Sequence, residues 1–275
     1  MQAPVPHPFF LPVDGIEIFC LHYTTGRGTP RGAVLYLHPF AEEMNKSRRM
    51  AALQSRRFAQ AGWEVLQLDL SGCGDSQGEF GDTGWDRWLT EAVAALDWLR
   101  GRVDGPIWLW GLRAGALIAS HAARRAPPPV RLLLWQPLTS GARQLQQILR
   151  LRVAGAAIGG EKAASGVREL RKRIAAGNAE EIAGYVISPT LATGLEQADL
   201  LLPAGDGRVG WLEVSHHSDA GVLPASREVI ERWRGAGCRV ESAVVSGQPF
   251  WQTVEIAECP DLLTATMDCF ERLNA

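Results

Sequence analysis

The sequence has no long uncharged hydrophobic run and no marked excess of charge of either sign. A helix that spans a bilayer needs about 20 consecutive apolar residues, and no stretch approaches that length, so we expect no membrane span. A net charge of −2 gives no basic field for nucleic acid. The first residues also lack the basic and apolar regions of a secretory signal peptide. We therefore expect a cytoplasmic protein.

Cysteines are few and scattered. The 275 residues contain five of them, an odd number with no C-x-x-C spacing. This pattern argues against a disulfide framework and against a zinc site of closely spaced thiolates. We expect reduced thiols, no bound metal and no other cofactor. The cysteines are Cys20, Cys73, Cys238, Cys259 and Cys269.

The sequence does have a regular alternation of short apolar runs and segments with helical periodicity, and 46% of its residues are hydrophobic. This alternation predicts an α/β fold, in which helices flank both faces of a mostly parallel central sheet. The expected strands are 16–23, 33–38, 64–70, 107–110, 130–135, 209–214 and 239–245, and the expected helices are 50–61, 85–99, 116–125, 224–235 and 261–273.

One stretch interrupts the alternation. Residues 139–199 are mostly helical in pattern and rich in arginine and lysine. We interpret them as a helical lid inserted into a core domain formed by residues 1–138 and 200–275. Charges of this kind are typical of the solvated faces of surface helices. The basic residues of the lid include Arg143, Arg150, Arg152, Arg168, Arg171, Lys172 and Arg173.

A short glycine-bounded motif lies between an apolar run and a helical segment. Residues 111–115 read Gly-Leu-Arg-Ala-Gly. A strand, a tight glycine turn and a helix form the context of a nucleophile elbow, where Gly-x-Ser-x-Gly presents a serine. The central residue here is Arg113, whose guanidinium stays protonated and cannot act as a nucleophile. The sequence therefore keeps the frame of a hydrolytic site without its usual attacking atom.

Three motifs and the order of the elements resemble the α/β-hydrolase superfamily across nearly the whole chain. Residues 37–40 resemble the loop after the third strand, residues 69–76 resemble an Asp-x-x-Gly-x-Gly-x-Ser loop, and residues 111–115 match the elbow. The resemblance implies an α/β-hydrolase fold with a helical lid insertion. It also implies an oxyanion loop at His38, Pro39 and Phe40.

A narrower resemblance concerns the segments 38–50 and 110–113, which are similar to the exosortase A system-associated hydrolase (type 2) group. Proteins of that group accompany bacterial exopolysaccharide and protein-sorting loci. The resemblance implies a cytoplasmic bacterial protein labelled a hydrolase by its fold, and it implies no particular substrate.

The family's catalytic triad follows the chain order nucleophile, acid, histidine. The acid position offers Asp219, with Glu213 as a second choice. The histidine is expected in residues 246–252, which contain none, and no histidine lies beyond His217. Nucleophile and base are thus both missing, and in a serine hydrolase the loss of either costs on the order of 10⁴-fold or more in rate.

Substitute catalytic groups are limited. His216 and His217 lie near Asp219, and a His–Asp pair can activate a water or a serine. The alternative is that these are ordinary loop residues, and their spacing does not indicate a metal site. Trp251 lies near the place of the missing histidine, where it would cover the pocket or pack in the core.

The elbow places Arg113, with Leu112 and Ala114 beside it, at the N-terminus of a helix. Free backbone N–H groups and the helix dipole favour an anion there. Two interpretations stay open. Arg113 binds the carboxylate or phosphate of a ligand, or it pairs internally with Glu42 or Glu43, because an unpaired buried charge is costly.

The segment 42–49 carries charges of both signs. It would be a loop at the carboxyl end of a strand, where α/β folds bind ligands, and Asn45, Lys46 and Arg49 would then contact a ligand head group. The alternative is a solvated loop in which Asn45 or Ser47 caps the following helix.

Two functions are consistent with these residues. The first is hydrolysis of an anionic ester or thioester, with Arg113 as an electrostatic clamp and a water or non-standard nucleophile. The second is a non-catalytic protein that keeps the hydrolase fold and binds an anionic small molecule, a peptide ligand or a partner protein. The sequence does not indicate an oligomeric state.

Overall fold

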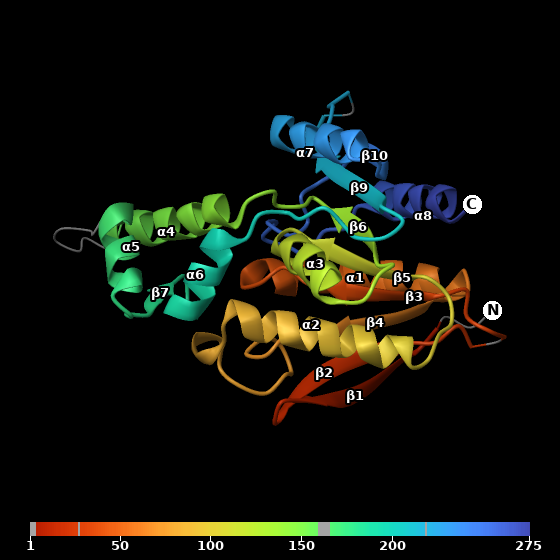
Figure 1. Cartoon of the computed structure of the whole chain (residues 1–275). Coiled ribbons are helices and arrows are strands. Elements are labelled where there is room, and N and C mark those ends of the chain that lie inside the picture. The colour runs from red at the N-terminus through yellow and green to blue at the C-terminus, as the bar shows by residue number, and fades with distance from the viewer. Residues whose placement is uncertain (1–3, 27, 159–165, 218) are drawn as a thin grey trace.

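A computed structural model describes residues 4–26, 28–158, 166–217 and 219–275. Its centre is an eight-stranded sheet in the order β1-β2-β4-β3-β5-β6-β9-β10 (Figure 1). The β1–β2 and β2–β4 pairs are antiparallel, and every later pair is parallel. The strands are β1 (Pro6–Val13), β2 (Ile16–Tyr23), β3 (Ala33–Leu37), β4 (Glu64–Leu68), β5 (Ile107–Leu112), β6 (Arg131–Trp135), β9 (Arg208–Ser215) and β10 (Arg239–Ser246).

Helices cover both faces of the sheet, as its continuous apolar strands require. On one face, Leu35 and Leu109 belong to a core cluster with α2, α3 and α7. On the other, Val34 and Trp108 belong to a cluster with α1 and α8. These helices are α1 (Glu42–Gln60), α2 (Trp85–Arg100), α3 (Ala114–Arg125), α7 (Pro224–Gly235) and α8 (Pro260–Asn274), with a short 3-10 turn η1 (Phe80–Asp82) before α2.

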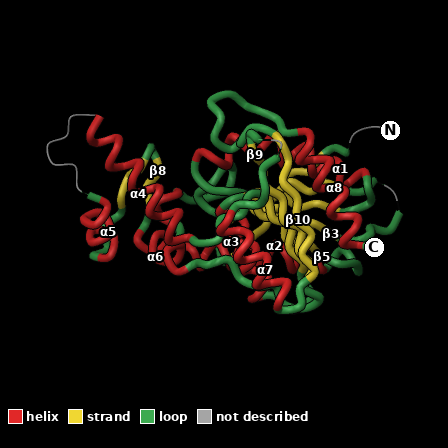
Figure 2. The backbone as a smooth tube through the Cα atoms, turned by 90° about the horizontal axis from the view of Figure 1, so that it is seen from above, coloured by secondary structure: helices red, strands yellow, loops and turns green. Residues whose placement is uncertain are grey.

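The inserted segment lies to one side of the sheet (Figures 1 and 2). It contains α4 (Gly141–Ile158), α5 (Val167–Ala175) and α6 (Pro189–Gln197), while residues 159–165 of the expected lid lie outside the described residues. It is not wholly helical, because β7 (Glu180–Ile182) and β8 (Tyr185–Ile187) form an antiparallel hairpin. The turn between them, Ala183-Gly184, has φ of 52° and 83°, as a tight type I′ hairpin requires.

Besides η1 and the β7–β8 hairpin, the strand β1 and the first turns of α1 were not predicted from the sequence. The strand β1 contains Pro6, Pro8 and Pro12, which weaken a strand prediction. Its place at the edge of the sheet explains why prolines are tolerated, since one side of an edge strand needs no N–H donors. The helix α1 begins at Glu42 rather than near residue 50, with consequences for the site.

Candidate functional site

Backbone strain gathers at one edge of the sheet. Of the five described non-glycine residues with positive φ, Ala41, Arg113 and Gln136 follow the carboxyl ends of β3, β5 and β6, with φ of 56°, 55° and 42°. Such conformations cost roughly 1–3 kcal/mol each and persist where the surrounding structure enforces them, which is often at functional sites. The other two such residues lie in hairpin turns. This edge is also where α/β sheets bind ligands.

The turn between β5 and α3 is sharp because two glycines allow close packing. A Cβ on Gly111 would lie 2.5 Å from Ala116 Cα, and one on Gly115 would lie 2.1 Å from the Leu37 carbonyl oxygen. Arg113 stands at the apex as the N-cap of α3, with φ 55° and ψ −118°. The structure therefore places Arg113 where the elbow frame presents its central residue.

The Arg113 side chain is paired with an acid from another element. Its Nε lies 3.2 and 3.4 Å from the two carboxylate oxygens of Glu43, and its Nη2 lies 3.2 Å from Glu43 Oε1. The two side chains are only 13% and 19% exposed. The indole of Trp251 lies 5.7 Å from the guanidinium carbon, so the cation also faces an aromatic ring. Of the two acids left open by the sequence, Glu43 is the partner.

Glu42 points elsewhere. One of its carboxylate oxygens lies 3.7 Å from Lys46 Nζ, and the other accepts a hydrogen bond of 3.4 Å from the Tyr185 hydroxyl of β8. Glu42 therefore joins the start of α1 to the inserted segment, and it does not reach the elbow.

The segment 42–49 is helix, which corrects its interpretation as a loop. Glu42 and Glu43 form the first turn of α1, where the positive end of the helix dipole favours acids. The N-cap is Ala41, so neither Asn45 nor Ser47 caps the helix. The helical start was hidden because charged side chains interrupt the apolar periodicity, although Met44, Ser47 and Met50 face the core. This early start is what brings Glu43 to the elbow.

The side chains of Asn45, Lys46 and Arg49 are exposed or engaged elsewhere, and their expected contacts with a ligand head group stay a prediction. Asn45 is exposed. Lys46 donates a 2.6 Å hydrogen bond to the Val254 carbonyl, and Arg49 pairs with Glu258. These contacts hold the segment after β10 against α1.

The place expected to carry the triad histidine holds an indole. Trp251 follows β10, is 4% exposed and packs edge-on against Phe250 with ring centroids 5.0 Å apart. Its Nε1 is buried with no hydrogen-bond partner among the described residues. No imidazole occupies this position, in agreement with the sequence.

The alternative base and acid lie on an exposed segment. His216, His217 and Asp219 are all exposed in the segment after β9. In the described part of the chain, no three His, Cys, Asp or Glu side chains gather in a way that could hold a metal ion. Glu213, the second-choice acid, is 2% exposed and accepts hydrogen bonds from Trp211 Nε1 at 3.0 Å and the Leu223 amide at 2.8 Å. Its carboxylate fixes the chain before α7.

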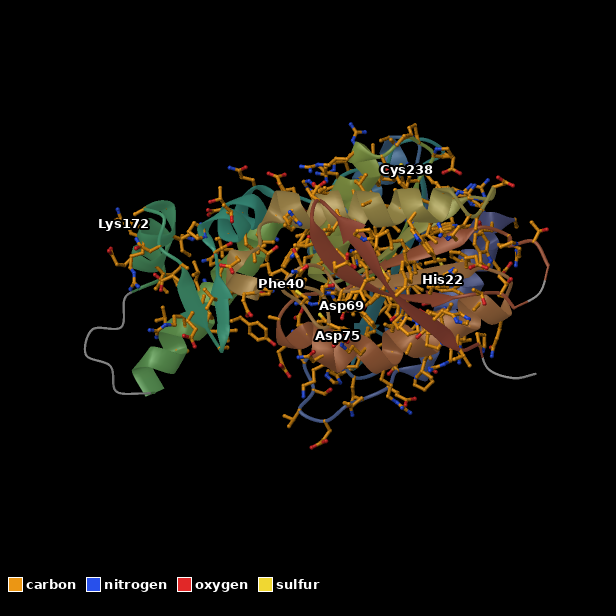
Figure 3. All side chains as sticks on the ribbon, turned by 90° about the horizontal axis from the view of Figure 1, so that it is seen from below. His22, Phe40, Asp69, Asp75, Lys172 and Cys238 are labelled. Carbon is orange, nitrogen blue, oxygen red and sulfur yellow. The ribbon has the colours of Figure 1, made fainter. Side chains whose placement is uncertain are left out.

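The expected oxyanion loop is packed and uncharged. His38 Nε2 accepts a 3.0 Å hydrogen bond from the Leu70 amide, which leaves Nδ1–H to donate to the Pro39 carbonyl at 2.6 Å. Burial lowers the pKa of His38, with Asp69 opposing. His38 is therefore a neutral structural residue. Phe40 packs against Trp88 at 5.7 Å, on the side of the core nearest the inserted segment (Figure 3).

Leu112 and Ala114, beside Arg113, are 0% and 1% exposed. As the first residue of α3, Ala114 has an amide with no acceptor inside its own helix. The elbow thus keeps one amide of the kind that stabilises an oxyanion.

The loop after β4 is held together by an acid–base network. Asp69 Oδ2 accepts hydrogen bonds from Arg48 Nη2 at 2.9 Å and from the Asp75 amide at 3.0 Å, and both aspartates lie near α1 (Figure 3). The Ser76 hydroxyl is bonded to the Asp69 carbonyl. These contacts agree with turn chemistry as the role of Asp75 and Ser76.

A hollow beside the elbow was not predicted from the sequence. It has a volume of about 220 Å³ and lies between the loop after β6, the first turns of α4 and the start of α7. Its walls come from parts of the chain more than a hundred residues apart, and no local motif signals it. The lining residues are Arg113, Gln136, Pro137, Leu138, Thr139, Ser140, Arg143, Gln144, Gln147, Leu223, Ala225 and Ser226.

A family profile identifies the protein family to which this geometry points. The profile described as serine aminopeptidase, S33 (Hydrolase_4) matches residues 28–198, more than half of the chain. The chain belongs to the serine aminopeptidase S33 family. The match includes residues 38–40, the turn at residues 111–115 and almost all of residues 139–199 of this S33 family member.

Curated relatives of this S33 family member include the lysophosphatidylserine lipases ABHD12. The protein of Gallus gallus is 28% identical over 125 residues, which are 44% of this chain and 32% of that protein. The protein of Xenopus tropicalis is 30% identical over 112 residues, 39% of this chain and 28% of that protein. The match spans about a third of the length of these relatives.

Solved structures confirm the α/β-hydrolase fold. Est1E from Butyrivibrio proteoclasticus, solved with ferulic acid, superposes with a TM-score of 0.65 at 14% identity, covering 97% of this chain and 99% of that one. A soluble variant of monoglyceride lipase from Saccharomyces cerevisiae gives 0.63 at 13% identity, covering 100% of this chain and 96% of that one. None of the described helices combines the length and hydropathy needed to cross a membrane.

Proposed function

We propose that this S33 family member is a binding protein that keeps the hydrolase frame and forms no acyl-enzyme. The observation that supports this proposal is the set of residues at the elbow. The apex holds Arg113, which is paired with Glu43 and faces Trp251. A guanidinium has no lone pair to attack a carbonyl, and the indole N–H of Trp251, the ring that faces it, is a donor that cannot act as a base.

The geometry also accounts for why a cation is tolerated there. Arg113 is largely buried, and a buried charge needs a partner with good geometry. Glu43 supplies one through three N–O contacts. The pair fills the place where a serine and histidine would meet, so the elbow serves as a fixed charged wall rather than as a reaction centre.

The ligand in this proposal is an anionic small molecule or peptide, or a partner protein bearing such a group. The hollow beside the elbow opens onto two arginines, Arg113 and Arg143. The resemblance of segments 38–50 and 110–113 to the exosortase-associated group supports a role in the cytoplasm of a bacterium, alongside exopolysaccharide or protein-sorting functions.

A second candidate is hydrolysis of an anionic ester or thioester, with Arg113 as a clamp and a water as the attacking group. It is favoured by the strained backbone at Arg113, which persists although no serine stands there. The names of the relatives, lysophosphatidylserine lipases, also favour it. Against it, the two histidines that could serve as a base, His216 and His217, are both exposed to solvent.

Turnover measurements separate the two candidates. The purified protein and its Arg113→Ala variant are incubated with a panel of esters, thioesters and lactones. The binding role predicts no turnover by the wild type above that of the variant for any substrate. Turnover that disappears in Arg113→Ala would establish the hydrolase instead.

A further inference from the structure

The hollow beside the elbow has one sign of charge. Arg113 and Arg143 line it, and none of the described residues in its lining is an aspartate or a glutamate. Glu43 neutralises Arg113, whereas Arg143, on α4, is exposed and has no ion-pair partner among the described residues. The Glu213 carboxylate, which bonds the amide of the lining residue Leu223, is directed at Trp211 and that amide. Arg143 is therefore an uncompensated cation facing the hollow.

One buried polar group in the wall lacks a partner. Gln144 is 9% exposed, lines the hollow, and its Oε1 has no hydrogen bond to any described residue. A buried amide without a partner costs roughly 1–3 kcal/mol. Its side-chain amide can turn either its oxygen or its N–H₂ group toward a ligand. Because its Oε1 has no partner where it stands, turning this amide toward the hollow costs that oxygen no existing hydrogen bond.

The start of a helix forms the opposite wall. The twelve-residue α7 begins at Pro224, and its N-cap, Leu223, offers no side-chain acceptor. Ala225 and Ser226, in its first turn, line the hollow. Helix N-termini favour anions because their first N–H groups have no intrahelical acceptor and the dipole is positive there.

We propose that the hollow binds the carboxylate or phosphate head of a small organic anion. Arg143 and the first turn of α7 receive the charged oxygens, and Gln144 completes the hydrogen bonds. The apolar side chains of Leu138 and Leu223, also in the lining, contact the organic part of the ligand. This inference rests on the proposed binding function and names its ligand class. It adds Arg143 and Gln144 as specificity-determining residues.

Calorimetry with simple probes tests this proposal. Phenyl phosphate and benzoate are titrated into the full chain, with benzyl alcohol as the neutral analogue of similar size. We expect at least one anion to bind and the alcohol to give no comparable heat. A hydrogen bond to a charged group contributes enough that Arg143→Gln should weaken binding about tenfold or more. Gln144→Leu should weaken it several-fold.

The matched control is Arg150→Gln, which removes an exposed cation of the same helix that does not line the hollow. It should leave the affinity unchanged. Absence of heat for both anions up to about 10 mM, equal binding of benzyl alcohol, an unchanged affinity in Arg143→Gln, or an equal loss in Arg150→Gln would each overturn the proposal. Circular dichroism of each variant shows whether the fold is kept.

Failure of the proposed ligand class and failure of the proposed non-catalytic function give different experimental results. If the chain hydrolyses esters but also binds phenyl phosphate through Arg143, the non-catalytic role is wrong and the ligand class stands. If it neither turns over substrates nor binds either anion, the ligand class is wrong and the non-catalytic role stands.

Discussion

At the scale of single residues, the pairing of Arg113 with Glu43 governs the chemistry of the elbow. Both side chains are more than four-fifths buried, and each satisfies a charge that would otherwise be left in a poorly solvated place. The pair is thus unlike the surface pair of Arg125 and Asp86, whose side chains are 46% and 84% exposed.

Breaking the elbow pair should therefore destabilise the fold. Arg113→Met leaves the Glu43 carboxylate buried and unpaired, and we expect the free energy of unfolding to fall by about 2–3 kcal/mol. The double variant Arg113→Met with Glu43→Leu should recover most of this loss, since replacing both charges by apolar groups is often nearly neutral. Urea unfolding measures both values.

Arg125→Met, which breaks the exposed pair of Arg125 and Asp86, is the control for these variants and should change the free energy of unfolding by less than about 1 kcal/mol. If Arg113→Met cost no more than Arg125→Met, the elbow pair would be no more important than a surface contact.

The burial of His38 predicts how the stability of the fold depends on pH. Its folded pKa is lowered by burial, so the unfolded chain takes up a proton on this side chain at a higher pH than the folded chain does. The stability that neutral His38 contributes to the folded state is complete above the unfolded pKa of about 6.5 and is lost progressively as the pH falls below that value. We expect the urea midpoint of the wild type to fall between pH 7 and pH 5.

The variant His38→Gln removes this proton uptake and should flatten the decline by roughly 1 kcal/mol per pH unit. His121, whose pKa is also lowered by burial, is the control residue. The variant His121→Gln should keep the share of the pH-dependent loss of stability that comes from His38. A decline in His38→Gln as steep as in the wild type would show that His38 is not held neutral.

The residues of the site were predictable from the sequence to different degrees. The place of Arg113 followed from two glycines between a strand and a helix, because that local pattern has few backbone solutions. The choice of Glu43 over Glu42 depends on the helical phase of α1, which neighbouring charges concealed. The packing of Trp251 against the guanidinium depends on a loop 138 residues further along the chain, where the sequence gives no orientation.

At the scale of elements, the turn from β5 into α3 depends on close backbone contact. Gly115→Ala would bring a Cβ to 2.1 Å from the Leu37 carbonyl, so the strand or the helix must shift. We expect a loss of about 2–3 kcal/mol in the free energy of unfolding. Gly155→Ala in α4 has open space around its Cβ and should instead stabilise the helix by roughly 0.5–1 kcal/mol.

Thermal and urea unfolding of these two variants measure the difference between them. Two glycine-to-alanine changes in helices should thus have opposite signs. Equal effects would mean that the elbow has room for a side chain and that its sharp turn is not enforced by packing.

Elements with regular apolar periodicity were predicted well, and those that function at an edge or a junction were not. The strands β3, β5 and β6 are buried on both faces, and their continuous apolar runs are unambiguous. The strand β1 is an edge strand with three prolines, and the hairpin β7–β8 has three residues in each strand. Such elements are stabilised by contacts with the rest of the fold rather than by their own pattern.

At the scale of the whole molecule, the sheet brings the ends of β3, β5, β6 and β9 to one edge, and the inserted α4 closes the hollow beside them. A mostly parallel sheet flanked by helices followed from the alternation of elements. The hollow did not, because its walls meet only when α4 and α7 are placed against the elbow. The same edge that would carry out hydrolysis in an α/β-hydrolase here carries a paired cation, a buried indole and the anion-binding hollow that we propose.

Labelling with a fluorophosphonate probe, read out by mass spectrometry of the intact chain and its peptides, tests the central claim most directly. The probe forms a covalent adduct only with a serine activated by a base. We predict no adduct on the native chain and none on Arg113→Ser, because the ring that faces residue 113 is Trp251, which cannot act as a base. An adduct on any serine of the native chain would contradict the account.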